Sequence, residues 1–140
     1  METKIKKENF DTIFGKMLGG WNRVSNHQWA PLGRVCICWD PEFCNVKELA
    51  SSDQFIQCEI QLLDVNKSVF VCFVYADNRY MGRRQLWRDM CNISGSISSV
   101  PWLVVGDFNA NRYIHEKVGG GILGGLPLKR NSIELLLRLS

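Results

Sequence analysis

The sequence predicts an α+β fold, because stretches with the period of a strand and stretches with the period of a helix both occur along one short chain. Residues 56–62 alternate apolar and polar side chains, which is typical of a strand with one buried face. Residues 69–75 and 101–105 are almost wholly apolar, as expected for strands covered on both faces. Apolar side chains at helical spacing occur before residues 56–62, and again between residues 69–75 and 101–105. We therefore expect β-sheets flanked by helices.

Composition sets the broad class of the protein. The chain has 140 residues, enough for one domain or part of one, with 46% hydrophobic and 22% charged residues. No apolar run approaches the roughly 20 residues that span a bilayer, and residues 1–4 are polar where a signal peptide would be apolar. We expect an intracellular protein without a membrane partner. A net charge of +3 permits a nucleic-acid partner without requiring one, and the oligomeric state stays open.

Residues 8–18 predict the first helix. Their apolar side chains form one helical stripe at Phe10, Ile13, Phe14, Met17 and Leu18. The pair Gly19–Gly20 ends this helix. Residues 21–31 contain several residues that break regular structure, so we expect an irregular segment there, with His27 exposed to solvent.

Residues 33–40 predict a buried strand that ends at Asp40–Pro41, since proline halts regular structure. The six cysteines include no Cys-x-x-Cys pair and no histidine at zinc-finger spacing. Four of them lie in apolar strand-like runs, namely Cys36, Cys38, Cys58 and Cys72. We interpret these four as buried free thiols rather than metal ligands or disulfides.

Residues 56–62 and 69–75 predict an antiparallel hairpin with a turn at 64–67, and we expect its second strand to lie deeper in the core. That strand ends at Tyr75. The segment Tyr75-Ala76-Asp77-Asn78 then carries a tyrosine and an amide out of the sheet.

A second helix comes next, starting near residue 83. Its predicted buried stripe contains Trp87 and Met90, with Ile93 and Ile97 as further candidates, and it decays into a loop from Gly95. Arg83 and Arg84 stand near its N-terminus, where unpaired backbone N–H groups and the helix dipole favour an anion. The alternative is that these arginines are only solvated.

The apolar residues 101–105 are followed by Gly106, Asp107 and Asn109, which we expect at the edge of a sheet. If the chain stays extended, Asp107 and Asn109 share one face and Phe108 points to the opposite, apolar face. The alternative is a strand followed by an Asx-type turn, because Asp and Asn are both favoured turn formers.

Residues 119–124 spell the G-x-G-x-x-G dinucleotide-binding pattern. No strand-like run leads into it, so we assign no nucleotide cofactor. We expect a glycine-rich loop here and a short helix over residues 131–139, capped by Asn131 or Ser132.

Five segments resemble one family in chain order. Residues 104–110 resemble the Gly-Asp-(Phe or Leu)-Asn signature of the endonuclease/exonuclease/phosphatase superfamily, the deoxyribonuclease I-like metal-dependent phosphodiesterases. Residues 75–78 resemble its Tyr-(Gly or Ala)-x-Asn motif, and residues 83–87 its Arg-Arg-x-Leu-Trp segment. Residues 1–4 and 33–41 resemble the Glu-Thr-Lys segment and the Gly-Arg…Trp-Asp-Pro strand of plant LINE-type retrotransposon endonucleases.

The resemblance covers residues 1–120 and leaves 121–140 as a divergent segment. It implies a four-layer α+β sandwich of two mixed β-sheets flanked by helices, incomplete at both ends of this chain. It also implies a single Mg²⁺ or Mn²⁺, a hard cation that neutralises charge developing on a phosphate. Glu2 would ligate this metal; without the resemblance, Glu2 would be interpreted as an exposed terminal acid.

The same resemblance implies roles for the other candidate residues. Asp107 would orient and activate the attacking water, and Tyr75 would help stabilise the transition state. Asn109 and Asn78 would hold phosphate oxygens. Arg83 or Arg84 would contact the phosphate from the helix.

The sequence also departs from the family pattern. It lacks an asparagine before the glutamate and a late acid–histidine pair, and His115 follows Asp107 by only eight positions. We therefore expect an internal fragment of a retroelement-derived, metal-dependent nucleic-acid phosphodiesterase domain. The alternative is a non-catalytic truncated domain that binds nucleic acid weakly through its basic side chains, among them Arg79, Arg83, Arg84 and Arg112.

Overall fold

The computed structural model describes residues 5–97, 100–110 and 134–138. Two helices and seven strands occur in this part of the chain, in the order α1 (Lys7–Met17), β1 (Asn22–Ser25), β2 (Cys36–Trp39), β3 (Cys44–Ser51), β4 (Phe55–Leu62), β5 (Lys67–Tyr75), α2 (Tyr80–Ser96), β6 (Trp102–Asp107) and β7 (Glu134–Arg138). None of the helices described is both long and apolar enough to cross a membrane.

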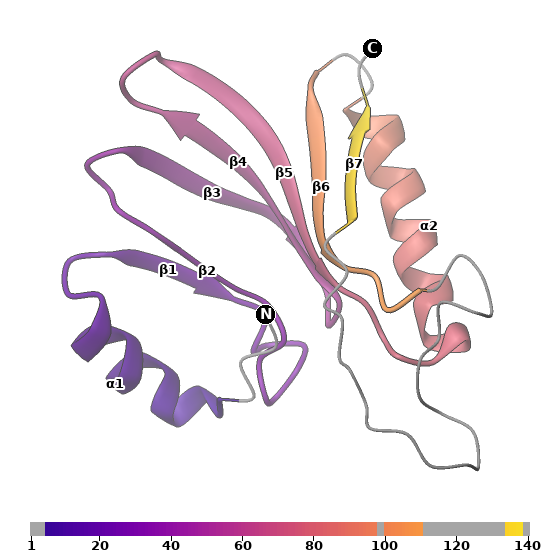
Figure 1. Ribbon diagram of the computed structural model, residues 1–140, viewed down its shortest axis with the longest axis horizontal. Helices are drawn as coiled ribbons and strands as arrows, with labels where there is room; N and C mark the ends of the chain where they lie inside the picture. Colours follow the sequence, from indigo (N-terminus) through magenta and orange to yellow (C-terminus); the bar gives the residue numbers. More distant parts are fainter. Residues whose placement is uncertain (1–4, 98–99, 111–133, 139–140) are drawn as a thin grey trace, which may run out of the picture.

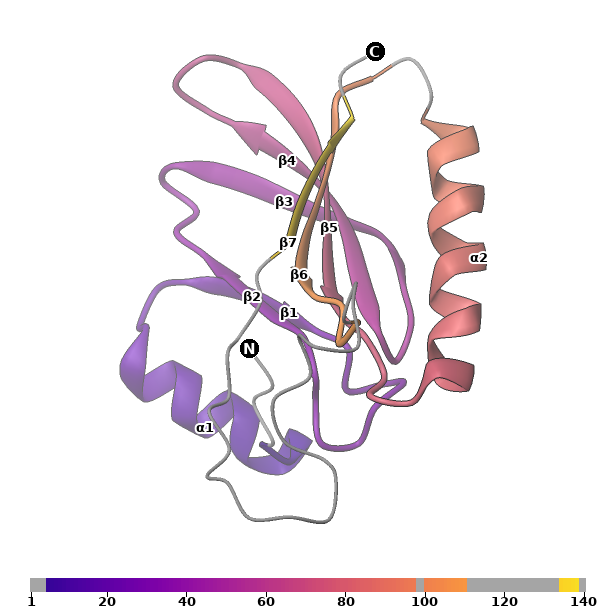
Figure 2. The ribbon, with the colours of Figure 1, turned by 45° about the vertical axis from the view of Figure 1, so that its right-hand side comes forward.

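The strands form two sheets. The larger sheet has the order β3-β4-β5-β6-β7, in which β5 and β6 are parallel and every other pair is antiparallel. The smaller sheet is the antiparallel pair β1–β2. In Figure 1 and Figure 2, α2 covers one face of the larger sheet, while β1–β2 and then α1 lie on its other side. The α+β architecture and its four layers are therefore as predicted.

Two apolar clusters hold the layers together, one on each face of the larger sheet. The cluster between this sheet and α2 contains Phe55, Cys72, Val74, Ala76, Leu86, Met90, Val104 and Phe108. The cluster between this sheet and β1–β2 contains Val35, Ile37, Ile56 and Cys58, with Phe73 and Tyr75 packed against it. Because successive side chains of a strand point to opposite faces, β4 and β5 contribute to both clusters.

The predicted hairpin is confirmed as β4 and β5, paired in register from Phe55↔Val74 to Leu62↔Lys67. Asn66 takes a φ of 49° in the connecting turn, a left-handed conformation that asparagine tolerates. All six cysteines are free, as predicted, although full burial holds only for Cys58 and Cys72. Cys36 and Cys38 are half-buried, with their sulfur atoms 3.6 Å apart.

Two segments differ from the sequence prediction in secondary structure. The stretch 21–31 was expected to be irregular, yet it contains β1, which pairs with β2. The helix expected over 131–139 is wrong for residues 134–138, which form β7 along β6. In both cases a neighbouring strand offers hydrogen-bonding partners that local sequence pattern does not reveal. Strand β3 was not predicted.

His27 is buried, contrary to the expectation of a solvated loop histidine. Its Nε2 donates to the carbonyl of Ile5 (2.8 Å), which leaves Nδ1 to accept from the Ser25 hydroxyl (2.7 Å). Its ring also meets Phe10 edge-on, with centroids 4.9 Å apart. His27 thus joins α1 to the end of β1 and is a structural residue.

The helical stripes are also narrower than predicted. In α1 only Phe10 is buried, while Ile13 and Met17 are exposed. In α2 the buried residues are Leu86 and Met90. Trp87 is 39% exposed, because its ring covers Phe108 at the margin of the core and does not enter it.

Candidate active site

The candidate site lies where the two parallel strands end. Tyr75, the last residue of β5, is in register with Asp107, the last residue of β6, and residues in register share a face of the sheet. Their common face is the one toward β1–β2, because Tyr75 packs against the cluster on that side. The N–H of Ala76 donates to the carbonyl of Asp107 (2.8 Å), which continues the pairing past the strand ends. The tyrosine and the acid predicted from sequence therefore lie side by side.

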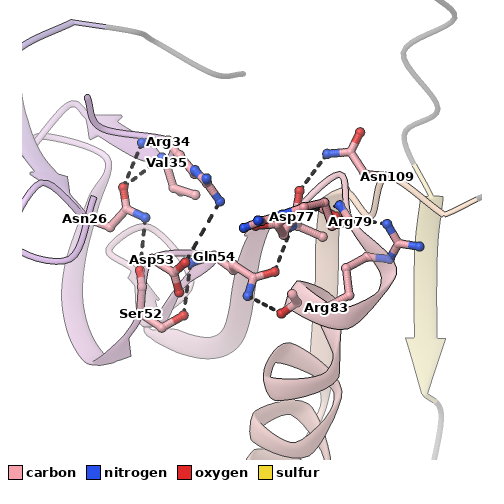
Figure 3. A network of polar contacts seen from close by, with 12 residues as sticks. Asn26, Arg34, Val35, Ser52, Asp53, Gln54, Asp77, Arg79, Arg83 and Asn109 are labelled. Carbon is pink, nitrogen blue, oxygen red and sulfur yellow. Dashed lines mark hydrogen bonds and ion pairs between the residues drawn. The ribbon is translucent and has the colours of Figure 1, made fainter. Parts of the chain in front are cut away.

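Asp107 and Asn109 form a turn. The N–H of Asn109 donates to a carboxylate oxygen of Asp107 (2.9 Å), and Asn109 has a φ of 47°. The structure thus selects the Asx-type turn over the extended alternative. The Asn109 side-chain nitrogen then donates to the carbonyl of Ala76 (2.6 Å), so this turn is tied to the loop after β5 (Figure 3).

Phe108 anchors this turn from behind. It is 2% exposed and points into the cluster under α2, on the face opposite Asp107, as predicted. The ring of Trp87 stacks on it at a centroid distance of 5.7 Å and an interplanar angle of 4°. The Asp107–Asn109 turn is thereby fixed to α2 as well as to β5.

Gly106 is required by the close approach of the two strands. A β-carbon added there would overlap the backbone of Val74, its partner on β5, and its φ of 144° disfavours other residues. Strand packing alone therefore explains why position 106 of the Gly-Asp-Phe-Asn segment is a glycine, whatever the chemistry of the site.

A cavity of about 300 Å³ opens beside the end of β5. Its lining comprises Arg34, Tyr75, Ala76, Asp77, Asn78 and Arg79. Two predicted site residues, Tyr75 and Asn78, thus line a cavity, and Asp107 and Asn109 stand at the adjoining strand end. Arg34 reaches the cavity from the segment before β2, on the other side of the interface between the sheets.

Asp77 organises the loop at this cavity. Its carboxylate accepts from the backbone N–H of Arg79 (2.7 Å) and, at 3.4 Å, from the Arg79 guanidinium. These hydrogen bonds hold the pKa of Asp77 below its ordinary value, the backbone N–H contributing most. A carboxylate so engaged is a poor general base, and its role is to shape the loop.

Arg83 and Arg84 lie at the start of α2 as predicted. One Arg83 nitrogen donates to the carbonyls of Asp77 and Asn78, each at 3.0 Å, so this side chain fixes the loop that carries Asn78 (Figure 3). The Arg84 guanidinium lies 5.8 Å from the ring centre of Tyr80, a cation–π arrangement. Contact of either arginine with phosphate stays a prediction.

Two contributors were missed by sequence reasoning. Arg34 belongs to the Gly-Arg segment that was interpreted as core only. Gln54 is 4% exposed, accepts from the N–H of Asp77 (2.8 Å) and donates to the carbonyl of Gly82 (3.0 Å). A single glutamine between strands carries no recognisable pattern, so only the fold could reveal it.

The predicted metal ligand Glu2 lies outside the described residues, as do Arg112 and His115. Within the described part of the chain, no three His, Cys, Asp or Glu side chains cluster closely enough to hold a metal ion. Asp107 offers the hard carboxylate oxygen that Mg²⁺ prefers, but the described residues alone do not form a metal centre.

No protein-family model matches the sequence, and no curated protein matches it significantly. Solved structures that share its fold include two domains. The endonuclease domain of TRAS1, a telomere-specific non-LTR retrotransposon, superposes with a TM-score of 0.59 at 9% identity, over 80% of this chain and 59% of that one. The human Nocturnin catalytic domain with bound sulfate anion gives a TM-score of 0.52 at 14% identity, over 74% of this chain and 47% of that one.

The chain thus spans about half the length of the structures that it matches. At identities of 9% and 14% the likeness concerns the fold alone. Over part of its length, the chain therefore has the deoxyribonuclease I-like α+β fold that the sequence predicts.

Proposed function

We propose that this chain is part of a metal-dependent phosphodiesterase domain that hydrolyses nucleic-acid phosphodiester bonds and derives from a retroelement. The observation that carries the proposal is the register Tyr75↔Asp107, which brings a phenol and a carboxylate to one face of the sheet beside a cavity. The cavity is lined by an amide, Asn78, and by two arginines, groups suited to a phosphate.

The resemblance assigns the following roles, which are part of the proposal. Asp107 orients and activates the attacking water, and Asn78 and Asn109 hold phosphate oxygens. Tyr75 stabilises charge that develops in the transition state, since a hydroxyl preorganised toward an oxyanion is worth most in a partly desolvated site. Glu2 is the proposed ligand of Mg²⁺ or Mn²⁺, which supplies Lewis-acid stabilisation of the phosphate.

Two further observations support a phosphate-directed site. The TRAS1 domain is an endonuclease, and the Nocturnin domain carries a sulfate, an anion with the shape of phosphate. Basic residues outnumber acidic ones by 17 to 14, which favours an anionic partner over a cationic one.

A plasmid-nicking assay tests the proposal. The sequence lacks the histidine and the early asparagine of the superfamily, and general acid–base assistance is commonly worth ~10² to 10⁴ in rate. We therefore expect no measurable nicking by these 140 residues with Mg²⁺ or Mn²⁺, and metal-dependent nicking by a form extended with its flanking coding sequence.

In the extended form, Asp107→Asn should abolish nicking. The matched control is Asp89→Asn, which changes a half-buried acid on α2 whose side chain accepts from Gln85. Equal loss of activity in both variants, or full activity in Asp107→Asn, would contradict the role of Asp107. Nicking by the 140 residues themselves would show that another group supplies the acid–base assistance of the missing histidine.

The second candidate function is non-catalytic binding of nucleic acid. The exposed guanidinium of Arg79, 84% accessible, lies at the cavity and favours this possibility. Such binding should weaken steeply as salt rises, because it releases counterions. An electrophoretic shift at low salt, lost at high salt, with no nicking by the extended form in either metal, would select this candidate.

A further inference from the structure

Arg34 lines the cavity from the smaller sheet's side of the molecule. It precedes β2, whereas the other described lining residues lie at the end of β5 and directly after it. The cavity therefore spans the interface between the two sheets, and any group held in it is contacted from both.

The backbone of Arg34 is held rigidly. The side-chain oxygen of Asn26 accepts from the N–H groups of Arg34 (3.0 Å) and Val35 (2.9 Å), and its nitrogen donates to the carbonyl of Ser52 (3.0 Å). Asn26 is fully buried, so its side-chain amide is shielded from water in all three hydrogen bonds (Figure 3). This amide joins the loop before β2 to the loop before β4 and fixes where the Arg34 side chain starts.

The guanidinium of Arg34 is incompletely paired. Its Nη1 atom is buried and makes no hydrogen bond to any of the described residues. The nearby acid Asp53 places a carboxylate oxygen 4.0 Å from Nη1, beyond hydrogen-bond length, and half of that side chain is exposed. A buried guanidinium donor without a hydrogen-bond acceptor is unfavourable. The Arg34 side chain as a whole is 32% exposed and lines the cavity, so an oxyanion there would be met by the accessible part of the guanidinium.

The other charged groups leave room for such an anion. Among the described residues that line the cavity, Asp77 is the acid, and its carboxylate is engaged by Arg79. Arg34 and Arg79 therefore outnumber the carboxylates of this described lining. Asp53, outside this lining, is the ion-pair partner of Arg34, but half of its side chain is exposed to solvent, which weakens its hold on the guanidinium.

We propose that Arg34 contacts a phosphate oxygen of the substrate across the cavity from Asn78 and Tyr75. This inference rests on the proposed function and adds a residue to it: the phosphate is held between the two sheets, by an amide from β5's end and by a guanidinium from the segment before β2. The planar fork of arginine can hold two phosphate oxygens, which lysine cannot.

Inorganic phosphate is the probe that tests the contact directly. We expect titration of the ¹⁵N-labelled 140-residue chain, at constant ionic strength, to shift the Nε–Hε resonance of Arg34 together with the amide resonances of residues 76–79. Saturable shifts of those amides without a shift at Arg34 would overturn the proposal, as would the absence of any saturable shift.

Two variants and a control sharpen the result. Arg34→Gln should weaken phosphate binding by about tenfold or more, since a charge-assisted hydrogen bond is lost, and Arg34→Lys should retain part of the affinity. Arg88→Gln changes an exposed arginine of α2 that donates to Gln85, and should leave the affinity unchanged. Equal affinity in Arg34→Gln and the unaltered chain would contradict the inference.

This test separates the inference from the proposed function. Phosphate binding at Arg34 in a chain whose extended form never nicks DNA would refute the phosphodiesterase and leave the anion contact standing. If the extended form nicks DNA and Arg34→Gln leaves the nicking unchanged, the phosphodiesterase stands and the Arg34 contact is refuted.

Discussion

Replacing Gln54 by leucine should destabilise the loop that carries the site, although Gln54 lies outside the cavity lining. Its side chain accepts from the N–H of Asp77 (2.8 Å) and donates to the carbonyl of Gly82 (3.0 Å). It thereby links the end of β5 to the first turn of α2. Leucine has a similar volume but leaves both backbone groups without this partner.

The magnitude comes from these two hydrogen bonds. Each unsatisfied, partly buried backbone group costs about 1 kcal/mol at the low end of the usual range, so Gln54→Leu should lower the free energy of unfolding by about 2 kcal/mol. For a domain of this size that corresponds to a fall in Tm of roughly 4–8 °C. Urea denaturation followed by circular dichroism measures the free energy, and hydrogen exchange should show faster exchange at the N–H of Asp77.

The matched control is Gln61→Leu. Gln61 lies on β4, and its side chain makes one exposed hydrogen bond to Asn66 (3.2 Å), so the change in unfolding free energy should stay below about 0.5 kcal/mol. If Gln54→Leu changes stability no more than Gln61→Leu, the reasoning that Gln54 supports the loop is refuted.

Three further predictions concern the strand contact, the loop acid and the thiols. Gly106→Ala should prevent correct β5–β6 pairing and yield mostly insoluble protein, whereas Gly95→Ala, which meets nothing within 4 Å, should leave solubility and the far-UV spectrum unchanged. Because the pKa of Asp77 is lowered on folding, the acid contributes stability above the unfolded pKa that is lost as pH falls through the folded pKa. The stability difference between the unaltered chain and Asp77→Asn, measured by urea titration from pH 6 downward, should therefore shrink toward acid pH; a difference independent of pH would contradict this. A thiol reagent at neutral pH should modify exposed Cys91 first and Cys58 only on unfolding. The reason is that burial raises the pKa of the Cys58 thiol to about 12. A fast phase of modification that survives in Cys91→Ser would contradict this order.

The strands with an uninterrupted pattern were predictable from sequence. The β4–β5 hairpin and β6 follow from alternation and from runs buried on both faces. Strand β3 does not, because its register shifts between Glu48 and Ala50, and such a bulge interrupts the two-residue period. Strand β1 has only four residues, of which Val24 alone is aliphatic, and β7 is rich in leucine, a good helix former. Both β1 and β7 are strands because each pairs with a neighbour, β1 with β2 and β7 with β6.

The candidate site was predictable where polar side chains stand at strand ends. Tyr75, Asn78, Asp107 and Asn109 could be named because they follow apolar strand-like runs and match two motifs of the family that the sequence resembles. The conformation of the Asp107–Asn109 turn could not be chosen, since both alternatives suit the residue types. Arg34 enters from a distant segment, and its place depends on how the two sheets pack, which no local pattern encodes.

Parallel pairing of β5 with β6 makes the approach of Asp107 to Tyr75 a late step of folding. The hydrogen bond between Asn109 and Ala76 joins residues 33 positions apart, with the whole of α2 between them. Closing a loop of that length costs chain entropy before any contact in it is gained, so such contacts form after helices and hairpins. The β4–β5 hairpin can form first and display Tyr75, but the neighbouring acid arrives only when α2 has docked. A substitution that slows docking of α2 would therefore delay the binding-competent state without altering the finished cavity.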